Sequence, residues 1–314
     1  MTAHAVVLDE QLVQQAKSVV ARLPDWNNED IAFEWMPGGG AHKNLKASAG
    51  TKQCMVKLWN IEWQGMSVMP PSGVVMENTR LAGAAGFGAT LLGISMTPLA
   101  MVIEFIPGHL LDVSDRAGKT RLVRAARRLH HSGVVFARDF NPFSDARAMF
   151  ACARQRGVGG SEALKDIQAV MDTVETSMDL RRNEYLPCHN DLYGANVLES
   201  VTGEVRVVDY DLAGNGDVCY ELGFIATYNE LDKDQIGQLC EDYFERNDPR
   251  QVAKVNLMAL AADYNSLALW TAAKAADNKN SDYDYEGEFH RSLKKVMRRI
   301  EDPDFLNLLQ AARR

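Results

Sequence analysis

Residues 188–198 read CHNDLYGANVL, and residues 207–211 read VVDYD. Asp191 is followed five positions later by Asn196, and a second carboxylate, Asp209, follows an apolar run. Phosphoryl transfer of the kinase type uses one carboxylate to orient the attacking hydroxyl, and an amide and another carboxylate to hold Mg²⁺. The pattern therefore predicts Asp191 as a catalytic base and Asn196 and Asp209 as magnesium ligands.

The same stretch allows a simpler interpretation, a turn in which Asn and Asp side chains cap helices and bond their own backbone. The order and spacing of the residues and the preceding strand all agree with the kinase interpretation, whereas either half alone is weak evidence. His189 is then expected to brace the loop and not to titrate in catalysis.

Other residues that a kinase-type nucleotide site requires occur earlier in the chain. Gly38, Gly39 and Gly40 lie between predicted strands, where backbone N–H groups can approach phosphates, although a flexible hairpin also explains them. Lys57 is a charge inside an apolar strand and needs a partner. We expect that partner to be Glu77 on the following helix, so that the ion pair holds the ammonium against the nucleotide's phosphates. The alternative is two separate surface charges.

The segment Val102–Gly108 is expected to be a hinge whose backbone reads the adenine edge of ATP, with Glu104 and Ile106 as the contact positions. Its specificity is low, because a strand that ends in Pro-Gly is common. Residues 117–120, AGKT, resemble the end of a phosphate-binding loop, but Val113 stands where the first glycine is required, so they predict a helix start.

Hydrophobic periodicity predicts an α+β chain that is β-rich at its start and mainly helical afterwards. Together with the kinase-type motifs, this pattern implies a two-lobed, protein-kinase-like fold. A β-rich N-terminal nucleotide-binding lobe is expected over residues 1–105, and a larger, mainly helical catalytic and substrate-binding lobe over 106–314. Further predictions are an opening helix over 9–22, a helix over 73–84, a strand over 205–210 that ends near Asp209, and helices over 251–275 and 286–314.

Composition excludes several classes of function. The net charge of −8 does not favour general electrostatic binding to nucleic acid or to an anionic membrane. The chain has no run of 18 apolar residues that would predict a membrane span. Five scattered cysteines suggest neither a disulfide framework nor a zinc site. The chain is expected to act in the cytoplasm on a small molecule, with no nucleic-acid or membrane partner.

With these motifs the chain resembles the choline/ethanolamine kinase family, within the group that includes aminoglycoside phosphotransferases, most clearly over Phe33–Gly223. The matching text is CHNDLYGANVL…VRVVDYDLAGNGDVCYELG. The resemblance implies ATP and Mg²⁺ as cofactors, a role for Asp211 in supporting the metal site, and a role for Glu221 in bracing the catalytic loop. A homodimer is compatible with it.

The resemblance also implies an aromatic acceptor site, because rings attract an ammonium group. Trp270 matches one such ring, and Tyr228 is expected to supply another. The chain departs from the family at Leu267, where a second tryptophan is frequent, and at His42-Lys43-Asn44, where a small hydroxyl residue and Asn are usual. Asn44 is still assigned to the nucleotide site.

The expected reaction is transfer of the γ-phosphate of ATP to a hydroxyl of a small, cationic amino alcohol. An aminoglycoside, thiamine or sugar kinase shares the same catalytic residues, and a nucleotide-binding scaffold without transfer activity is the alternative from another class.

Overall fold

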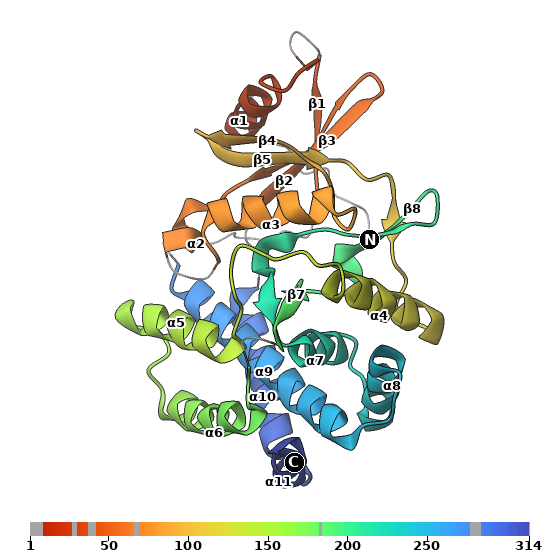
Figure 1. The fold of residues 1–314 in the computed structure, drawn as a ribbon. Coiled ribbons are helices and arrows are strands. Elements are labelled where there is room, and N and C mark those ends of the chain that lie inside the picture. The colour runs from red at the N-terminus through yellow and green to blue at the C-terminus, as the bar shows by residue number, and fades with distance from the viewer. Residues whose placement is uncertain are drawn as a thin grey trace.

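Alternating apolar residues build one antiparallel sheet in the N-terminal part of the chain, with strand order β1-β2-β3-β5-β4 (Figure 1). The structure is a computed structural model that describes residues 9–26, 30–36, 42–65, 69–181, 184–276 and 284–313. The elements of this part are α1 (Glu10–Val20), β1 (Ala32–Trp35), β2 (Lys43–Ala49), β3 (Lys52–Leu58), α2 (Ile61–Gly65), α3 (Ser72–Ala84), β4 (Leu91–Met96) and β5 (Leu99–Glu104).

Helix α1 packs its apolar side on the sheet. Its buried residues Leu12, Ala16 and Val19 have helical spacing and join a core with Val56 and Ala100 of the central strands. The carboxylate of Asp9 caps the helix by accepting a hydrogen bond from the backbone N–H of Gln11 (2.9 Å). The predicted helices over 9–22 and 73–84 are thus confirmed in α1 and α3.

The C-terminal part is mainly helical and surrounds the long helix α9 (Figure 1). Asp248 caps α9 and Pro249 occupies its first turn, where a missing N–H costs no hydrogen bond. The helices of this part are α4 (Arg116–His130), α5 (Pro142–Gln155), α6 (Glu162–Met178), α7 (Val218–Tyr228), α8 (Lys233–Phe244), α9 (Pro249–Lys274), α10 (Tyr285–Ile300) and α11 (Phe305–Arg313). The predicted α+β fold class is confirmed.

Two small antiparallel sheets position the loops between β7 and α7. Strand β7 (Leu186–Cys188) pairs with β10 (Gly214–Gly216), and β8 (Val197–Ser200) lies between β6 (Gly108–Leu110) and β9 (Val205–Val207). The 3₁₀ helices η2 (Gly194–Asn196) and η3 (Tyr210–Leu212) complete this region. Because β6 belongs to the second of these sheets, the predicted boundary at 105/106 falls between β5 and the β6–β8 pair; the division into two domains stays a prediction.

Two predicted elements differ from the structure. The strand predicted over 205–210 ends at Val207, and Asp209 lies beyond it with φ 69°, in the left-handed region. The helix predicted over 286–314 is two helices, α10 and α11, because the chain turns at Asp302-Pro303, where proline cannot continue a helix.

The residues 117–120 begin a helix as predicted. Asp115 caps α4 by accepting a hydrogen bond from the N–H of Gly118 (2.8 Å), and a Cβ on Gly118 would lie 1.7 Å from the carbonyl oxygen of Asp112. This glycine therefore serves close packing of the backbone. Within the described ranges, no helix is both long and apolar enough to cross a membrane.

Candidate active site

Lys57 of β3 joins the two carboxylates of the 207–211 segment. Its Nζ lies 2.7 Å from Oδ1 of Asp209 and 2.5 Å from Oδ1 of Asp211. The side chains of Lys57 and Asp211 are buried, whereas that of Asp209 is about one third exposed. The structure thus brings three of the predicted site residues together across the interface between the sheet and the helical part.

The charges of this cluster depend on one another. Burial alone would raise the pKa of Asp209, but the ammonium of Lys57 and its hydrogen bond lower it well below the usual range. Burial, and then the negative charge of Asp209, raise the pKa of Asp211 to about 7. Burial disfavours the charged form of Lys57, yet the two carboxylates raise its pKa. Lys57 is therefore an ammonium held between two carboxylates.

The predicted catalytic loop, residues 189–196, places Asp191 beside Asn196. The amide nitrogen of Asn196 donates to Oδ2 of Asp191 (3.0 Å) and to its backbone oxygen (2.9 Å), which fixes the amide's orientation. Burial and the nearby charge of Asp209 raise the pKa of Asp191 well above the ordinary value. Asn196 is also tied to the 207–211 segment, since its carbonyl accepts from the N–H of Val208 (2.9 Å).

Backbone strain accompanies these side chains. Asn190 and Asp209 both have positive φ (64° and 69°), a conformation that costs free energy in residues other than glycine. The imidazole of His189 donates through Nε2 to the carbonyl of Val208 (2.9 Å), and burial lowers its pKa. His189 therefore links the catalytic loop to the segment that carries Asp209, as a bracing residue would.

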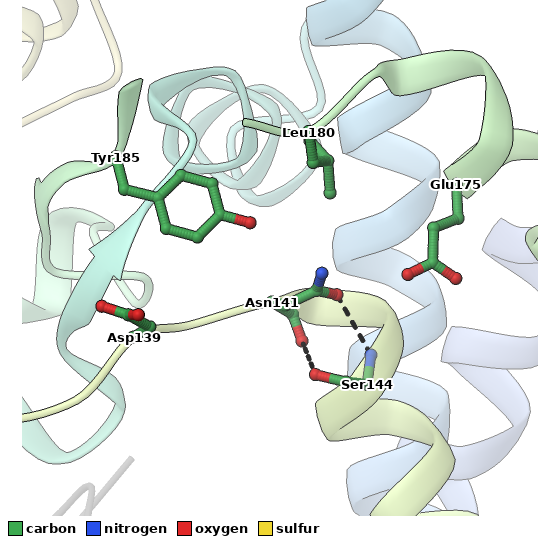
Figure 2. A pocket seen from close by; sticks show the side chains of 6 residues that line it. All are labelled: Asp139, Asn141, Ser144, Glu175, Leu180 and Tyr185. Atoms are coloured by element: carbon green, nitrogen blue, oxygen red, sulfur yellow. Dashed lines mark hydrogen bonds between the residues drawn. The ribbon is translucent and has the colours of Figure 1, made fainter. Parts of the chain in front are cut away.

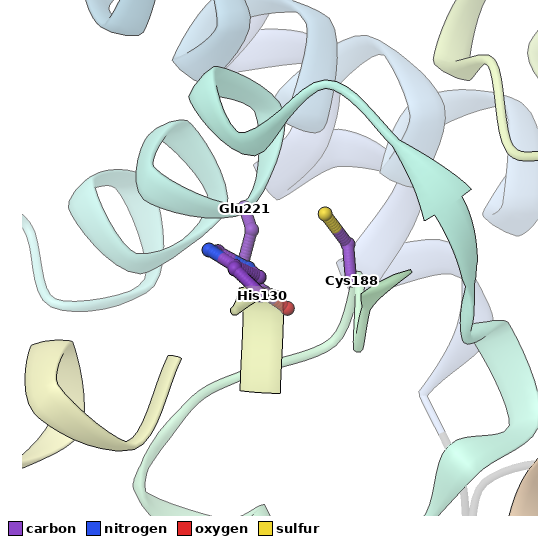
Figure 3. Close-up of side chains that lie close together, drawn as sticks. All are labelled: His130, Cys188 and Glu221. Carbon is purple, nitrogen blue, oxygen red and sulfur yellow. The ribbon is translucent and has the colours of Figure 1, made fainter. Parts of the chain in front are cut away.

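Glu221 of α7 holds the other side of the loop. Its Oε1 accepts from the N–H of Asn190 (2.8 Å) and its Oε2 is bonded to Nε2 of His130, whose Nδ1 lies 2.6 Å from the hydroxyl of Tyr243. Figure 3 shows Cys188 beside this pair. Burial and the charge of Glu221 raise the pKa of the Cys188 thiol far above its usual value, so the thiol stays protonated. Both carboxylate oxygens of Glu221 and both ring nitrogens of His130 already have partners, which favours a bracing network over a metal site.

The predicted ion pair between Lys57 and Glu77 is wrong. The side chain of Glu77 is 42% exposed and makes a two-pronged ion pair with Arg80, one turn along α3 (2.6 and 2.8 Å). Helical spacing of three residues places these two side chains on the same face, so Arg80 competes for the carboxylate. The carboxylates that neutralise Lys57 come instead from Asp209 and Asp211.

The other residues predicted to bind the nucleotide are less closely tied to the cluster around Lys57. Gly38, Gly39 and Gly40 lie outside the described residues. Asn44 pairs with Lys57 in the β2–β3 ladder, which places both near the same end of the sheet. The carboxylate of Glu104 accepts from the N–H and the hydroxyl of Thr90 (3.1 and 2.9 Å), and Ile106 is buried. Their contact with adenine stays a prediction.

Tyr228 lies near the catalytic loop and is 41% exposed, with other side chains close to its ring. Phe224, one turn earlier on α7, stacks on it at 4.1 Å and 17°. The ammonium of Lys295 lies over the ring at 5.4 Å from its centroid, and a ring stacked at 4.1 Å leaves room for it only on the opposite face. Tyr193 of the catalytic loop approaches at 5.4 Å. An acceptor ammonium would therefore compete with Lys295 for the face of Tyr228.

Trp270 lies on α9 one turn beyond Ser266, whose hydroxyl is 3.4 Å from that of Tyr228. The Trp270 ring is half-buried and 6.3 Å from that of Tyr285. Tyr228 also lines a hollow of about 490 Å³ with residues 111–114, Lys119, Asn229 and Glu230. Gly194 of the catalytic loop lies against this wall, because a Cβ added to it would be 3.0 Å from the side chain of Val113. The hollow therefore adjoins the catalytic loop.

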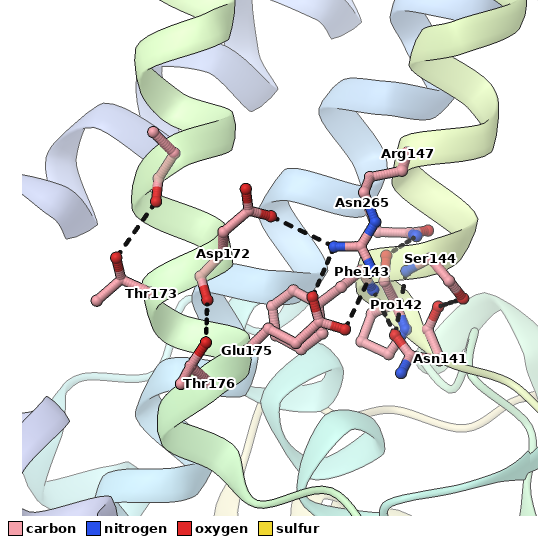
Figure 4. A network of polar contacts seen from close by, with 11 residues as sticks. Asn141, Pro142, Phe143, Ser144, Arg147, Asp172, Thr173, Glu175, Thr176 and Asn265 are labelled. Atoms are coloured by element: carbon pink, nitrogen blue, oxygen red, sulfur yellow. Dashed lines mark hydrogen bonds and ion pairs between the residues drawn. The ribbon is translucent and has the colours of Figure 1, made fainter.

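A hollow of similar size, about 470 Å³, contains none of the predicted site residues. Figure 2 shows its lining by Asp139, Asn141, Ser144, Glu175, Leu180 and Tyr185. Asn141 caps α5, and Glu175 forms an ion pair with Arg147 (2.6 Å), which also reaches Asp172 (Figure 4). Of this lining, Glu175 thus joins α6 to α5 through Arg147.

The sequence did not lead us to three features of the site: the side chains of Phe224 and Lys295, and the burial of His42. The four-residue spacing of Phe224 and Tyr228 was a usable signal, since such pairs touch on a helix. Lys295 carried no signal, because it reaches Tyr228 from another helix. His42 was visible as a departure from the family pattern, and its environment is described below.

Comparisons with known proteins address the family and the fold of the chain. The model of the phosphotransferase enzyme family (APH) matches residues 80–255, more than half of the chain. No curated protein sequence matches the chain. Among solved structures, a choline/ethanolamine kinase family protein from Mesorhizobium loti is 20% identical with a TM-score of 0.77, covering 96% of this chain and 99% of that one.

Two further structures share the fold. A Plasmodium vivax ethanolamine kinase is 15% identical with a TM-score of 0.73, covering 97% of this chain and 92% of that one. A spectinomycin phosphotransferase in complex with ADP and spectinomycin is 15% identical with a TM-score of 0.53, covering 98% of each chain. The predicted family resemblance is thereby confirmed, and the chain belongs to the phosphotransferase enzyme family.

Proposed function

We propose that the protein is a magnesium-dependent kinase that transfers the γ-phosphoryl group of ATP to a hydroxyl of a small, cationic amino alcohol. The observation that carries the proposal is the convergence of Lys57, Asp209 and Asp211, with Asp191 and Asn196 on the adjoining loop. A cation and hard oxygen ligands at one cleft are what phosphoryl transfer requires.

In the proposed reaction, Asp191 accepts the proton of the acceptor hydroxyl. The hydroxyl oxygen forms a bond to the γ-phosphorus, the bond from that phosphorus to the β–γ bridging oxygen breaks, and ADP leaves. The hydrogen bond from Asn196 holds the Asp191 carboxylate in place for this step. Lys57 is already oriented by two carboxylates, so its ammonium is positioned for phosphate oxygens without a conformational search.

The donor set fits magnesium, which prefers hard oxygen ligands and keeps several waters or phosphate oxygens. The two hydrogen bonds from the amide nitrogen of Asn196 leave its oxygen as the ligand atom, and Asp209 is a firmly ionised carboxylate. Asn196 and Asp209 would hold the ion, which neutralises phosphate charge when it is bound. Asp211, bonded to Lys57, supports this site.

The proposed acceptor site lies beside Asp191, between Tyr228 and Trp270. The rings of Tyr193 and Tyr228 approach each other next to the base, and carboxylates of Asp112 and Glu230 line or rim the adjoining hollow. Aromatic faces and carboxylates favour a cation. Since Lys295 already occupies one face of Tyr228, an acceptor with a small amine fits this site better than a bulky quaternary ammonium group.

The decisive experiment is an acceptor screen that measures ATP consumption with choline, ethanolamine, thiamine, sugars and aminoglycosides at matched concentrations. The proposal predicts ADP formation that depends on Mg²⁺ and on an added amino alcohol. The Asp191→Ala variant should bind nucleotide but lose turnover, and near-normal turnover in it would remove the assignment of the base.

Other outcomes of the screen identify other functions. Turnover with an aminoglycoside or a sugar, but with no amino alcohol, would keep the kinase and replace the acceptor. Nucleotide binding without consumption on the whole panel would favour a scaffold without transfer activity.

A further inference from the structure

His42 presents a single, fixed hydrogen-bond donor to the candidate phosphate site. Its Nδ1 accepts from the backbone N–H of Asn60 (3.1 Å), so the proton of the neutral ring is on Nε2. Burial lowers the pKa of His42 to about 3, and the neighbouring Lys57 ammonium acts in the same direction, which keeps the ring neutral. The indole of Trp59 lies 5.1 Å away at 41° and restricts rotation of the imidazole.

This donor has no hydrogen-bond partner among the described residues. His42 is 3% exposed, and Nε2 is fully buried and unsatisfied. Its nearest acidic oxygen is Oδ2 of Asp211, at 3.4 Å, beyond the usual range for a good hydrogen bond. A buried donor without an acceptor costs free energy, so an unsatisfied one at a site calls for an explanation, such as a ligand that supplies the acceptor.

We propose that His42 is a phosphate-binding residue, whose Nε2–H donates to a β- or γ-phosphate oxygen of the bound nucleotide. The inference rests on the proposed function, because it places the triphosphate beside Lys57. Asp211 connects the two residues, with Oδ1 on Lys57 and Oδ2 towards His42. Lys57 and His42 thus flank the same carboxylate, and the proposal places the phosphate within reach of both.

The sequence position agrees with this role. His42 directly follows the glycine-containing stretch 38–41 and precedes β2.

The competing explanation is that His42 serves only Asp211 and the packing around Trp59. A packing role would alter the stability of the protein, and its effect on nucleotide affinity would not depend on the number of phosphates. A phosphate ligand instead makes the effect appear with di- and triphosphates and disappear with the monophosphate.

The test compares wild type with His42→Leu, which lacks the donor, and His42→Gln, which retains one. Calorimetry measures the Kd of AMP and of the non-hydrolysable β,γ-imido analogue of ATP, both with Mg²⁺. We expect His42→Leu to weaken binding of the analogue about 10-fold, the loss of one charge-assisted hydrogen bond, while AMP changes less than twofold. The Gln variant should recover most of the analogue's affinity.

Thermal unfolding without ligand checks that each variant folds, and if His42→Leu does not, His42→Met provides the same comparison. Equal weakening of AMP and the analogue, no weakening of the analogue, or a Gln variant as weak as the Leu variant would each overturn the role of His42. If the wild-type protein binds neither nucleotide, the proposed function is overturned together with this inference. If the wild-type protein shows turnover but the variants give any of the three results above, only the role of His42 is overturned.

Discussion

The ammonium nitrogen of Lys57 lies 2.7 Å from Oδ1 of Asp209, although 152 positions separate the two residues in the chain. The contact joins the central strand of the sheet to the loop that follows β9. The same nitrogen reaches Asp211, so one buried cation neutralises two carboxylates. The pairing of Lys57 with these two carboxylates therefore contributes both to the stability of the fold and to the arrangement of the site.

Lys57→Met should lower kcat by about 10²–10³-fold, because a positioned cation next to the transferred phosphoryl group is lost. It should also lower the free energy of unfolding on the order of 3 kcal/mol, since the buried carboxylate of Asp211 loses its partner. Urea unfolding and steady-state kinetics measure the two effects. The double variant Lys57→Met/Asp211→Asn should regain part of the stability but none of the activity. If the double variant is less stable than the single one, the loss of stability in Lys57→Met does not come from the unpaired carboxylate of Asp211.

Glu77→Gln should leave kcat and the KM for ATP within about twofold of wild type, because Glu77 is exposed and pairs with Arg80, and exposed pairs contribute little. Arg80→Gln is the matched control and should behave alike. Steady-state kinetics at varied ATP measure both. A loss of activity in Glu77→Gln comparable to that of Lys57→Met would show that Glu77 turns towards Lys57 in the working enzyme.

The rate should fall on the acidic side with a midpoint above the ordinary pKa of aspartate, about 3.9. Asp191 must be ionised to accept a proton, and its pKa is raised, so it holds its proton to higher pH than a free aspartate and activity is lost as pH falls through that raised value. The measurement is kcat/KM for the acceptor against pH at saturating ATP. A midpoint at or below the ordinary value would contradict the environment assigned to this carboxyl.

Lys295→Met should raise kcat/KM for quaternary ammonium alcohols relative to primary-amine alcohols about 2- to 5-fold. Removing the ammonium over Tyr228 frees a ring face whose attraction for a cation is about 0.5–1 kcal/mol at exposed sites. Lys294→Met, which removes an exposed charge from the neighbouring position of α10, is the control and should leave the ratio unchanged. Equal effects of the two substitutions would indicate a change in the overall field and not at the ring.

Local patterns determined much of the site. The spacing of Asp191, Asn196 and Asp209 predicted the loop that we propose to be catalytic, because few other functions require an acid, an amide and a second acid in that order. The strand that carries Lys57 was also predictable, since a lone cation in an apolar run implies a buried partner. Periodicity located α1, α3 and the strands of the sheet, where side-chain burial repeats every 3.6 or 2 residues.

The tertiary structure alone decided which partners these residues have. The sequence pattern favoured Glu77 as the partner of Lys57, and the choice of Asp209 and Asp211 instead came from the packing of the sheet on the β9–η3 segment and from Arg80. Likewise, the approach of Lys295 to Tyr228 depends on how α10 and α7 both pack on α9. Sequence spacing fixes which groups are near along one element, whereas contacts between elements depend on their relative placement in space, which no local pattern encodes.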